Sequence, residues 1–401
     1  MENLDIYKDI AERTDGDIYV GVVGPVRTGK STFIKKFMEL LVLPNIDNEY
    51  KRERAIDELP QSAAGKTIMT TEPKFIPNEA VEITIADNLK LKTRMVDCVG
   101  YLVNNAIGYL ENDMPRMVKT PWSAEEIPFE RAAEIGTKKV IEEHSSIAIL
   151  VTTDGSITGI PREDYVEPEE RVARELTAKQ KPFVIVLNAE DPFSEENKRL
   201  ACELEDKYNT AVVPLNCTEL SLENINDIFS KILFEFPIEQ INIKFPRWIE
   251  GLQDTNEIKT ELFSEIKDCF TNTKKLKEVS DDVAKLQSTQ VITRTEITKI
   301  DLGTGNVELS ISLKDELFYK VLTEITGEEI ADEGKLFAKI TEFSKIKKEY
   351  DKLEYALHEV REKGYGIVNP TVDDLILEEP EIIKQGKQYG IKLKANAPSL
   401  H

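Results

Sequence analysis

A buried strand, a glycine loop and an amphipathic helix follow one another near the start of the chain. The strand is the apolar run at 18–23 (IYVGVV), the loop is 24–31 (GPVRTGKS), and the helix is expected over 29–43. The loop matches the full phosphate-binding pattern GxxxxGK[ST], which works only where a strand passes into a helix N-terminus. The chain is therefore predicted to begin with an α/β nucleotide-binding domain.

The residue types of this loop fit the binding of phosphate and a divalent cation. Its two glycines allow the backbone to curl so that successive N–H groups face the phosphates. The lysine is expected to contact the β and γ oxygens, and the serine to bind Mg²⁺. We interpret the arginine as a solvated side chain, with a phosphate or a neighbouring subunit as the alternative contacts. The predicted nucleotide-binding residues here are Gly24, Pro25, Val26, Arg27, Thr28, Gly29, Lys30, Ser31 and Thr32.

Further apolar runs alternate with helical stretches up to about residue 235. Nearly continuous aliphatic runs indicate parallel strands buried on both faces. Two runs alternate instead and are separated by ADNLK, which predicts a hairpin. Strand–helix alternation of this kind predicts a doubly wound, mostly parallel sheet. The continuous runs after the loop are 147–152, 183–187 and 211–215, the hairpin runs are 81–85 and 91–96, and the helices are 127–144, 169–179 and 194–208.

The pattern changes after FPIEQINIKFPRW, which carries two prolines and no helical period. We therefore predict a P-loop domain over 1–237 and a second, α+β region over 238–401, with a further division near 330 as an alternative. The second region is expected to contain one long core-facing helix at 249–286, with a coiled-coil arm as the alternative reading. Two alternating strands about the turn at 303–306 and two helices, at 317–325 and 330–362, are expected to follow.

Two motifs after the loop have the residue types of a magnesium site and its switches. Asp97 ends a predicted strand and begins DCVG, so its carboxylate can reach Mg²⁺ and the N–H of Gly100 can turn to a γ-phosphate. Thr70 and Thr71 lie in TIMTTEP, between the P-loop and DCVG. A threonine hydroxyl there can complete the Mg²⁺ shell when a triphosphate is bound. We predict catalytic roles for Lys30, these threonines and Asp97, and Thr71 as a third Mg²⁺ ligand.

The base-recognition loop is less clear. Asn188 and Asp191 have the spacing of the guanine-reading pattern NKxD, but Ala189 replaces its lysine. The next strand is followed by LNCTE where a serine–alanine–lysine loop would stand. Both departures favour adenine over guanine. Asn188 is predicted either to contact the nucleotide or to cap the next helix or hold the loop.

Composition excludes several classes of function. The 401-residue chain has a formal net charge of −22, which opposes general nucleic-acid binding and attraction to an anionic membrane. Its four cysteines have neither CxxC pairing nor a nearby histidine, so no zinc site is expected. The polar N-terminus is unlike a signal peptide, and no apolar run approaches the roughly 20 residues that span a bilayer. A soluble, cytoplasmic protein is expected.

Several segments together resemble one family over the whole chain. They are GVVGPVRTGKSTFIKKFM, LPQSAAGKTIMTTEPKFIP, VDCVGY, TTDGSITGIPREDYVEPEERV and GKQYGIKLKANAPSLH. These segments resemble stage IV sporulation protein A, the spore-coat morphogenetic ATPase of endospore-forming bacteria. Because the chain ends abruptly at KANAPSLH, it is expected to lack the family's C-terminal membrane-anchoring segment.

The resemblance implies a function that the spacing of residues does not. It implies a domain of the translation-factor GTPase class that has lost guanine specificity and hydrolyses ATP with Mg²⁺. In that reading Lys30 binds phosphate, Asp97 coordinates Mg²⁺, and Thr70 and Thr71 are the sensor threonines. Hydrolysis would drive homopolymerisation into the basement layer of the spore coat, in the mother-cell cytoplasm at the surface of the outer forespore membrane. A small amphipathic membrane peptide would recruit the protein, and other coat morphogenetic proteins would dock on it. Membrane contact by this chain would be indirect.

Two alternatives remain open at this point. One is a GTP-dependent regulatory switch, and the other is a structural filament subunit whose nucleotide is never cleaved. Hydrolysis commonly uses a glutamine beyond DxxG to orient the attacking water, whereas Tyr101 follows Gly100 here and no glutamine lies nearby. Slow turnover is therefore expected, with a neighbouring subunit as one source of the missing group.

Overall fold

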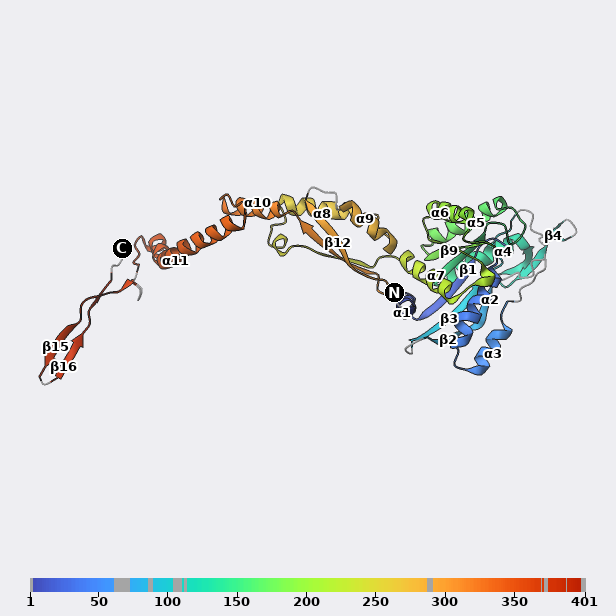
Figure 1. Cartoon of the computed structure of the whole chain (residues 1–401), viewed down its shortest axis with the longest axis horizontal. Coiled ribbons are helices and arrows are strands. Elements are labelled where there is room, and N and C mark those ends of the chain that lie inside the picture. The colour runs from blue at the N-terminus through green and yellow to red at the C-terminus, as the bar shows by residue number, and fades with distance from the viewer. Residues whose placement is uncertain are drawn as a thin grey trace. The chain divides into compact units, whose positions relative to one another are not determined.

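The computed structural model describes residues 3–60, 73–85, 89–103, 110–111, 114–286, 291–368, 370, 374–386 and 388–397. Contacts divide the chain into two compact units, Met1–Ser312 and Leu313–His401. The first unit holds the phosphate-binding loop and the large sheet (Figure 1).

The centre of the first unit is a six-stranded sheet in the order β10-β9-β8-β1-β3-β2. Neighbouring strands are parallel except for β2, which pairs antiparallel with β3. The predicted doubly wound, mostly parallel sheet and the predicted hairpin are both confirmed, although the ADNLK turn lies partly outside the described residues. The strands are β1 (Asp17–Val23), β2 (Lys74–Ile85), β3 (Leu89–Asp97), β8 (Ile147–Thr153), β9 (Phe183–Asn188) and β10 (Val212–Leu215).

Helices bury both faces of this sheet, which explains why its central strands are almost wholly apolar. On β8, Ile149 belongs to the core formed with α1, α2 and α7, whereas its neighbours Ala148 and Leu150 belong to the core formed with α5 and α6. Successive side chains of a strand point to opposite faces, so both faces require apolar residues. The helices are α1 (Asn3–Arg13), α2 (Lys30–Phe37), α3 (Glu49–Asp57), α4 (Phe129–Lys139), α5 (Glu163–Ala178), α6 (Glu195–Tyr208) and α7 (Leu222–Glu235).

Among the described residues between β3 and α4 there are two small hairpins. They pair β4 (Leu110–Glu111) with β5 (Met114–Pro115), and β6 (Met117–Thr120) with β7 (Ser123–Pro128). They were not predicted from the sequence, because runs this short carry too little periodicity to be recognised.

The rest of the first unit is a three-stranded sheet with two helices. Its strands, in the order β11-β13-β12, are β11 (Gln240–Lys244), β12 (Ile292–Asp301) and β13 (Asn306–Leu313), and its helices are α8 (Glu257–Phe270) and α9 (Val279–Leu286). The predicted pair of strands about 303–306 is confirmed. The single helix predicted over 249–286 is wrong. Leu276 N–H donates to the Phe236 carbonyl, and Ile238 N–H donates to the Lys274 carbonyl. These bonds take backbone groups at 274–276 out of a helix and separate α8 from α9.

Over its described residues, the second unit contains two helices and two strand pairs. The helices are α10 (Asp315–Thr326) and α11 (Glu333–Lys363), and the strands are β14 (Ile376–Leu377), β15 (Glu381–Gln385), β16 (Gln388–Lys392) and β17 (Ala395–Asn396). Asp332 caps α11 by accepting from Lys335 N–H, and Gly364, with φ of 78°, ends it. Both predicted helices are confirmed. Among the residues that the structure describes, no helix combines the length and apolar character needed to cross a membrane.

Candidate nucleotide-binding site

The phosphate-binding loop lies at the carboxyl end of β1 and passes directly into α2. Gly24 and Gly29 have φ of 137° and 96°, which side chains with a Cβ rarely adopt. A Cβ on Gly24 would lie 2.3 Å from the Val151 carbonyl oxygen, and one on Gly29 would lie 2.3 Å from Asn188 Nδ2. Both glycines are therefore required by backbone conformation and by space. Arg27 also has a positive φ of 63°, an uncommon conformation for a residue of its size.

Lys30 places a buried cation at the mouth of the loop. Its Nζ donates to the carbonyl oxygens of Gly24 at 3.2 Å and Pro25 at 2.5 Å. Burial lowers the pKa of Lys30, and the nearby Cys98 and Asp97 oppose that shift only in part. A buried ammonium held by two neutral carbonyls is incompletely compensated. Phosphate oxygens at this place would give it the charged partners that it lacks.

Ser31 and Asp97 bring two oxygens together beside the lysine. The Ser31 hydroxyl donates to Asp97 Oδ2 at 3.0 Å, and Asp97 pairs with Val22 at the end of β1. The other carboxylate oxygen of Asp97 is buried without a hydrogen-bond partner among the described residues, and burial raises the pKa of this group. An orphaned, buried carboxylate oxygen next to a hydroxyl fits a hard divalent cation such as Mg²⁺. Thr70 and Thr71, the other predicted ligands and sensors, lie outside the described residues.

The DCVG segment contacts the phosphate-binding loop directly. The N–H of Val26 donates to the Tyr101 carbonyl at 2.9 Å. Gly100 has φ of 88°, and a Cβ there would lie 2.1 Å from the Gly24 carbonyl oxygen. The Tyr101 hydroxyl donates to the Glu175 carboxylate at 2.7 Å, and burial, followed by this bond, raises the pKa of Tyr101. The tyrosine is therefore committed to α5 and does not offer its hydroxyl to the phosphates.

Asn188 joins the phosphate-binding loop to the loop after β10. Its Nδ2 donates to the Thr28 carbonyl at 3.0 Å, and its Oδ1 accepts from Cys217 N–H at 2.9 Å. Of the roles considered from the sequence, holding the loops matches these contacts. The next helix is capped by Ser194, which accepts from Asn197 N–H.

The other residues of the predicted base-recognition loop differ in burial. Ala189 is fully buried, and its N–H donates to the Leu215 carbonyl at 3.1 Å. Asp191 is exposed, and its backbone carbonyl accepts from Asn197 Nδ2 at 2.9 Å. The long lysine stem of a guanine-reading loop has no counterpart at the buried Ala189.

The loop after β8 is bonded to this same edge of the sheet. Asp154 accepts from Ser156 N–H at 2.9 Å and from Asn197 Nδ2 at 3.1 Å. The Ser156 hydroxyl in turn accepts from Glu190 N–H at 3.0 Å. The sequence signal for it is DGSITG directly after a central strand, a pattern that favours a turn but also allows the loop to border the site. These bonds fix the β8 loop against the β9 loop.

A buried polar cluster lies under this loop. Glu169 is fully buried on α5 and accepts from Thr152 at 2.5 Å and Tyr208 at 2.9 Å. Arg162 lies 2.6 Å from the same carboxylate and donates to it a second time at 2.8 Å. Burial raises the pKa of Tyr208, as does the neighbouring Glu169. The cluster anchors the segment between β8 and α5, and its carboxylate is fully paired.

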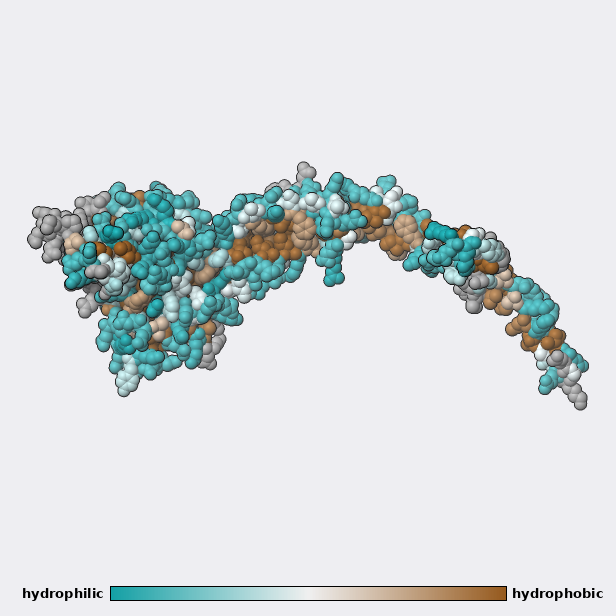
Figure 2. Space-filling model, turned by 180° about the vertical axis from the view of Figure 1, so that it is seen from behind, coloured by the Kyte–Doolittle hydropathy of each residue, from teal (hydrophilic) through white to brown (hydrophobic). Residues whose placement is uncertain are grey.

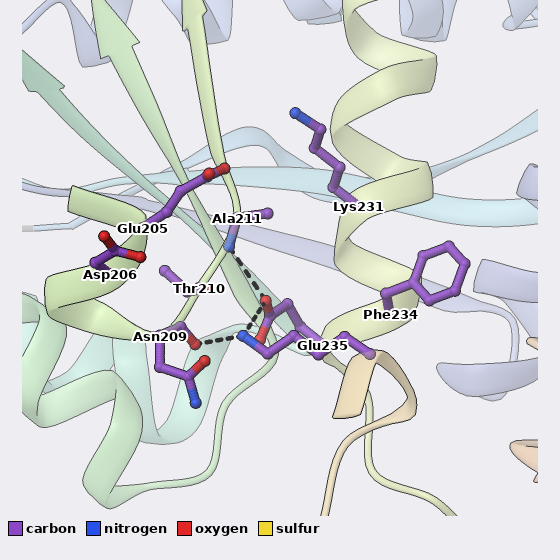
Figure 3. Close-up of a pocket in the computed structure, with 9 residues that line it drawn as sticks. Glu205, Asp206, Asn209, Thr210, Ala211, Lys231, Phe234 and Glu235 are labelled. Atoms are coloured by element: carbon purple, nitrogen blue, oxygen red, sulfur yellow. Dashed lines mark hydrogen bonds and ion pairs between the residues drawn. The ribbon is translucent and has the colours of Figure 1, made fainter. Parts of the chain in front are cut away.

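A separate cavity of about 340 Å³ lies at the opposite, amino end of β10 (Figure 3). In it the buried Glu235 pairs with Lys275 at 2.7 Å and Lys277 at 3.0 Å, and accepts from Ala211 N–H at 3.2 Å. The nucleotide-binding loops lie at the carboxyl ends of the strands, so this cavity is not part of the candidate site. Its carboxylate has charged partners on the turn that precedes α9, which indicates a structural role.

Comparison with known proteins identifies the family. A family model described as the ATPase domain of stage IV sporulation protein A matches residues 1–237, and one described as the middle domain of that protein matches 238–401. The chain is 52% identical over 399 residues to stage IV sporulation protein A of Clostridioides difficile (strain 630), covering 100% of this chain and 81% of that protein. It is 46% identical over 401 residues to the Bacillus subtilis (strain 168) protein of that name, covering 100% and 82%.

A solved structure gives a weaker likeness. The crystal structure of a complex of SsGBP and GDP aligns with a TM-score of 0.32 and 14% identity, over 58% of this chain and 55% of that one. A score this low does not establish a shared fold. The family models and the full-length identities are sufficient without it, and the chain belongs to the stage IV sporulation protein A family.

Proposed function

We propose that this protein hydrolyses ATP slowly and that hydrolysis drives its self-assembly into the basement layer of the spore coat. Lys30 and Asp97 carry this proposal, because each is a buried charge that lacks adequate compensation. The family identifies an ATPase domain and a role in sporulation, and therefore implies nucleotide binding and hydrolysis. Uncompensated charges of both signs in one loop cluster are expected where a phosphate and a cation bind together.

The residues of the site would have separate roles in phosphoryl transfer to water. The loop N–H groups and Lys30 would bind the β and γ oxygens, and Ser31 and Asp97 would hold Mg²⁺, which neutralises phosphate charge when bound. Water attacks the γ phosphorus, the bond to the β-phosphate oxygen breaks, and ADP and phosphate leave. Residues 101–110 contain no glutamine, and Tyr101 is bonded to Glu175. A poorly oriented water supports slow turnover.

Adenine preference is proposed from the β9 loop. Ala189 cannot supply the lysine stem that packs along a guanine in the NKxD loop, and Asn188 already bonds to Thr28 and Cys217. We also assign the domain to the translation-factor class of P-loop proteins. The resemblance supports this assignment, and the β2–β3 hairpin between the P-loop and DCVG is compatible with it.

The proposed setting is the mother-cell cytoplasm at the outer forespore membrane. A small amphipathic membrane peptide would recruit the protein, and other coat morphogenetic proteins would bind to it. The net charge of −22 opposes direct attraction to an anionic bilayer, which supports indirect membrane contact for this chain. No nucleic-acid partner is proposed, for the same electrostatic reason.

The test is phosphate release with ATP and with GTP side by side, recorded together with light scattering for assembly. Wild-type protein should release phosphate from ATP and scatter light, whereas Lys30→Ala should bind no ATP, release no phosphate and retain its circular-dichroism spectrum. Near-normal ATP affinity in Lys30→Ala would remove the loop from nucleotide binding. A strong GTP preference would replace the ATP proposal by the GTP-dependent switch, for which the retained Asn188 and Asp191 are the supporting residues.

The commitment of Tyr101 to Glu175 favours one second candidate. In it the protein is a structural subunit that binds ATP without cleaving it, and ATP stabilises the folded, assembling form by mass action. The same experiment separates the two functions. ATP-dependent scattering without phosphate release would support the structural subunit and contradict the ATPase proposal.

A further inference from the structure

Helix α11 presents an unusual number of apolar side chains to solvent. It has 31 residues, and eight of its large apolar side chains are exposed. Phe337, Ile340 and Tyr355 lie outside one line along the helix, whereas five recur at intervals of three, four or seven residues: Phe343, 39% exposed, Ile346, 56%, Tyr350, 50%, Leu357, 42%, and Val360, 46%. Figure 2 shows apolar residues reaching the surface in the part of the chain after the ATPase domain. Contiguous apolar surface of this kind marks an interaction site more often than a free surface.

The spacing of these residues is that of a short coiled coil. Together with the half-buried Leu353, they follow intervals of three, four, three, four and three residues, which place them at alternating a and d positions of a heptad. We name this set the α11 stripe: Phe343, Ile346, Tyr350, Leu353, Leu357 and Val360. It extends about 27 Å along the helix. A stripe of this period matches another helix that carries the same period.

The order of the stripe fits a second copy of the same helix running antiparallel. In an antiparallel pair, a positions of one helix face d positions of the other. Phe343 then faces Val360 of the second copy, Ile346 faces Leu357, and Tyr350 faces Leu353. Every member of the stripe is paired, and the two-fold axis falls between 351 and 352. The contact is self-complementary, as a symmetric dimer requires.

The charges beside the stripe distinguish the two orientations. In the antiparallel pair Lys347 lies beside Glu354 of the other copy, and Glu342 lies beside Lys363. Symmetry repeats each contact, so every facing pair of charges is opposite in sign. In the parallel pair Glu342 would again meet a lysine, Lys347, but Glu349 would meet Glu354, a like-charge contact on both sides of the dimer. The flanking charges therefore favour the antiparallel arrangement.

We propose that α11 is a self-association surface through which two copies of this chain form an antiparallel coiled coil. The role of this coiled coil, as one of the contacts of the assembly, rests on the proposed function. The contact itself needs no nucleotide, because every residue that carries it lies on α11.

The first experiment measures association of the full chain without nucleotide by sedimentation equilibrium. Wild type should show a concentration-dependent monomer–dimer equilibrium. Ile346→Lys should weaken association by more than about tenfold, since two buried apolar side chains per dimer are replaced by charges. Tyr355→Lys is the matched control, because Tyr355 is 68% exposed on the same helix but lies outside the stripe. A monomeric wild type, or a dimer that Ile346→Lys leaves unchanged, would overturn the proposal.

The second experiment tests orientation by disulfide trapping. It uses a Cys202→Ser, Cys269→Ser background, since Cys98 and Cys217 are buried. Chains carrying Phe343→Cys should form a disulfide dimer only when mixed with chains carrying Val360→Cys. Disulfide dimers of Phe343→Cys alone would indicate a parallel pair and contradict the antiparallel assignment.

A charge exchange gives an independent check on orientation. In the antiparallel pair Glu354→Lys should weaken the dimer, because the new lysine faces Lys347, and adding Lys347→Glu should restore it. In a parallel pair Glu354→Lys would instead strengthen the dimer, because the new lysine would face Glu349. A tighter dimer of the single variant would therefore contradict the antiparallel assignment.

ATP turnover is measured on every one of these variants, which separates the coiled coil from the proposed function. Wild type is measured beside them. A wild-type dimer that releases no phosphate from ATP would refute the proposed ATPase alone, and a monomeric wild type that turns over ATP would refute the coiled coil alone.

Discussion

Asn188→Ala should strongly destabilise the ATPase domain, because one side-chain amide satisfies two buried backbone groups. The substitution removes two hydrogen bonds and leaves two backbone groups, the Thr28 carbonyl and the Cys217 N–H, without their partner. Both residues are buried, so water does not readily replace the amide. A buried polar group left unsatisfied costs about 1–3 kcal/mol. We expect the free energy of unfolding to fall by about 2–4 kcal/mol, with partial entry of water reducing the upper limit.

The matched control is Asn216→Ala, the same substitution in the adjacent loop. Asn216 Oδ1 accepts from the N–H of Thr218 at 3.0 Å and from its hydroxyl at 2.7 Å. Thr218 is exposed, so solvent can replace the lost acceptor. We expect this variant to lose about 1 kcal/mol or less.

Thermal unfolding followed by circular dichroism, with and without Mg–ATP, compares the two variants. For a domain of this size, 2–4 kcal/mol corresponds to a fall in Tm of about 4–16 °C. Asn188→Ala should also bind ATP more weakly, because Thr28 belongs to the phosphate-binding loop. If Asn188→Ala lowers Tm no more than Asn216→Ala does, the bridge is not what holds the two loops, and our reading of Asn188 is wrong.

Three further predictions concern other parts of the chain. Changing Thr70 and Thr71 together to alanine should spare ATP binding but block phosphate release, and unchanged turnover would remove them from the sensor role. Gly100→Ala should weaken ATP binding in titration calorimetry and lower the free energy of unfolding by about 1–3 kcal/mol. The residue has a positive φ, and its new Cβ would lie 2.1 Å from the Gly24 carbonyl oxygen. A hydrogen bond from Lys299 lowers the pKa of Asp301 from its ordinary 3.8 to about 2. The ionised Asp301 therefore stabilises the folded state above pH 4, and this stabilisation is lost as the pH falls through 2. The difference in Tm between wild type and Asp301→Asn should therefore shrink over that interval.

Local signals were sufficient for the large sheet and for the phosphate end of the site. The strands are buried on both faces, so their sequences are continuous aliphatic runs that stand out from the helices between them. The loop glycines are also specified locally, because the positive φ of Gly24 and Gly29 belongs to the turn itself. The position of Asp97 could be predicted for the same reason, since it is the last residue of a strand that the alternating pattern of the sequence predicts.

Long-range backbone pairing explains the main error in the predicted fold, the single helix over 249–286. The stretch 249–286 has helical periodicity throughout, but residues 236–238 bond to 274–276 and interrupt it. Periodicity reports which faces are buried and carries no information about a distant segment that competes for backbone hydrogen bonds. The role of Asn188 was left open for a similar reason, since its partners lie 160 and 29 residues away in the sequence.

The position of Asn188 also bears on how nucleotide identity and phosphate binding are connected. The loop that would contact the purine follows β9, and the loop that would contact the phosphates follows β1, with β8 between them in the sheet. Asn188 bridges that separation, because it ends β9 directly before the first loop and bonds to Thr28 in the second. Its neighbour Ala189 is fully buried, so a larger side chain there would displace the backbone that positions Asn188. If the loop after β9 contacts the purine as proposed, purine preference and phosphate binding would both depend on the buried Asn188 amide, which is bonded to Thr28 and Cys217.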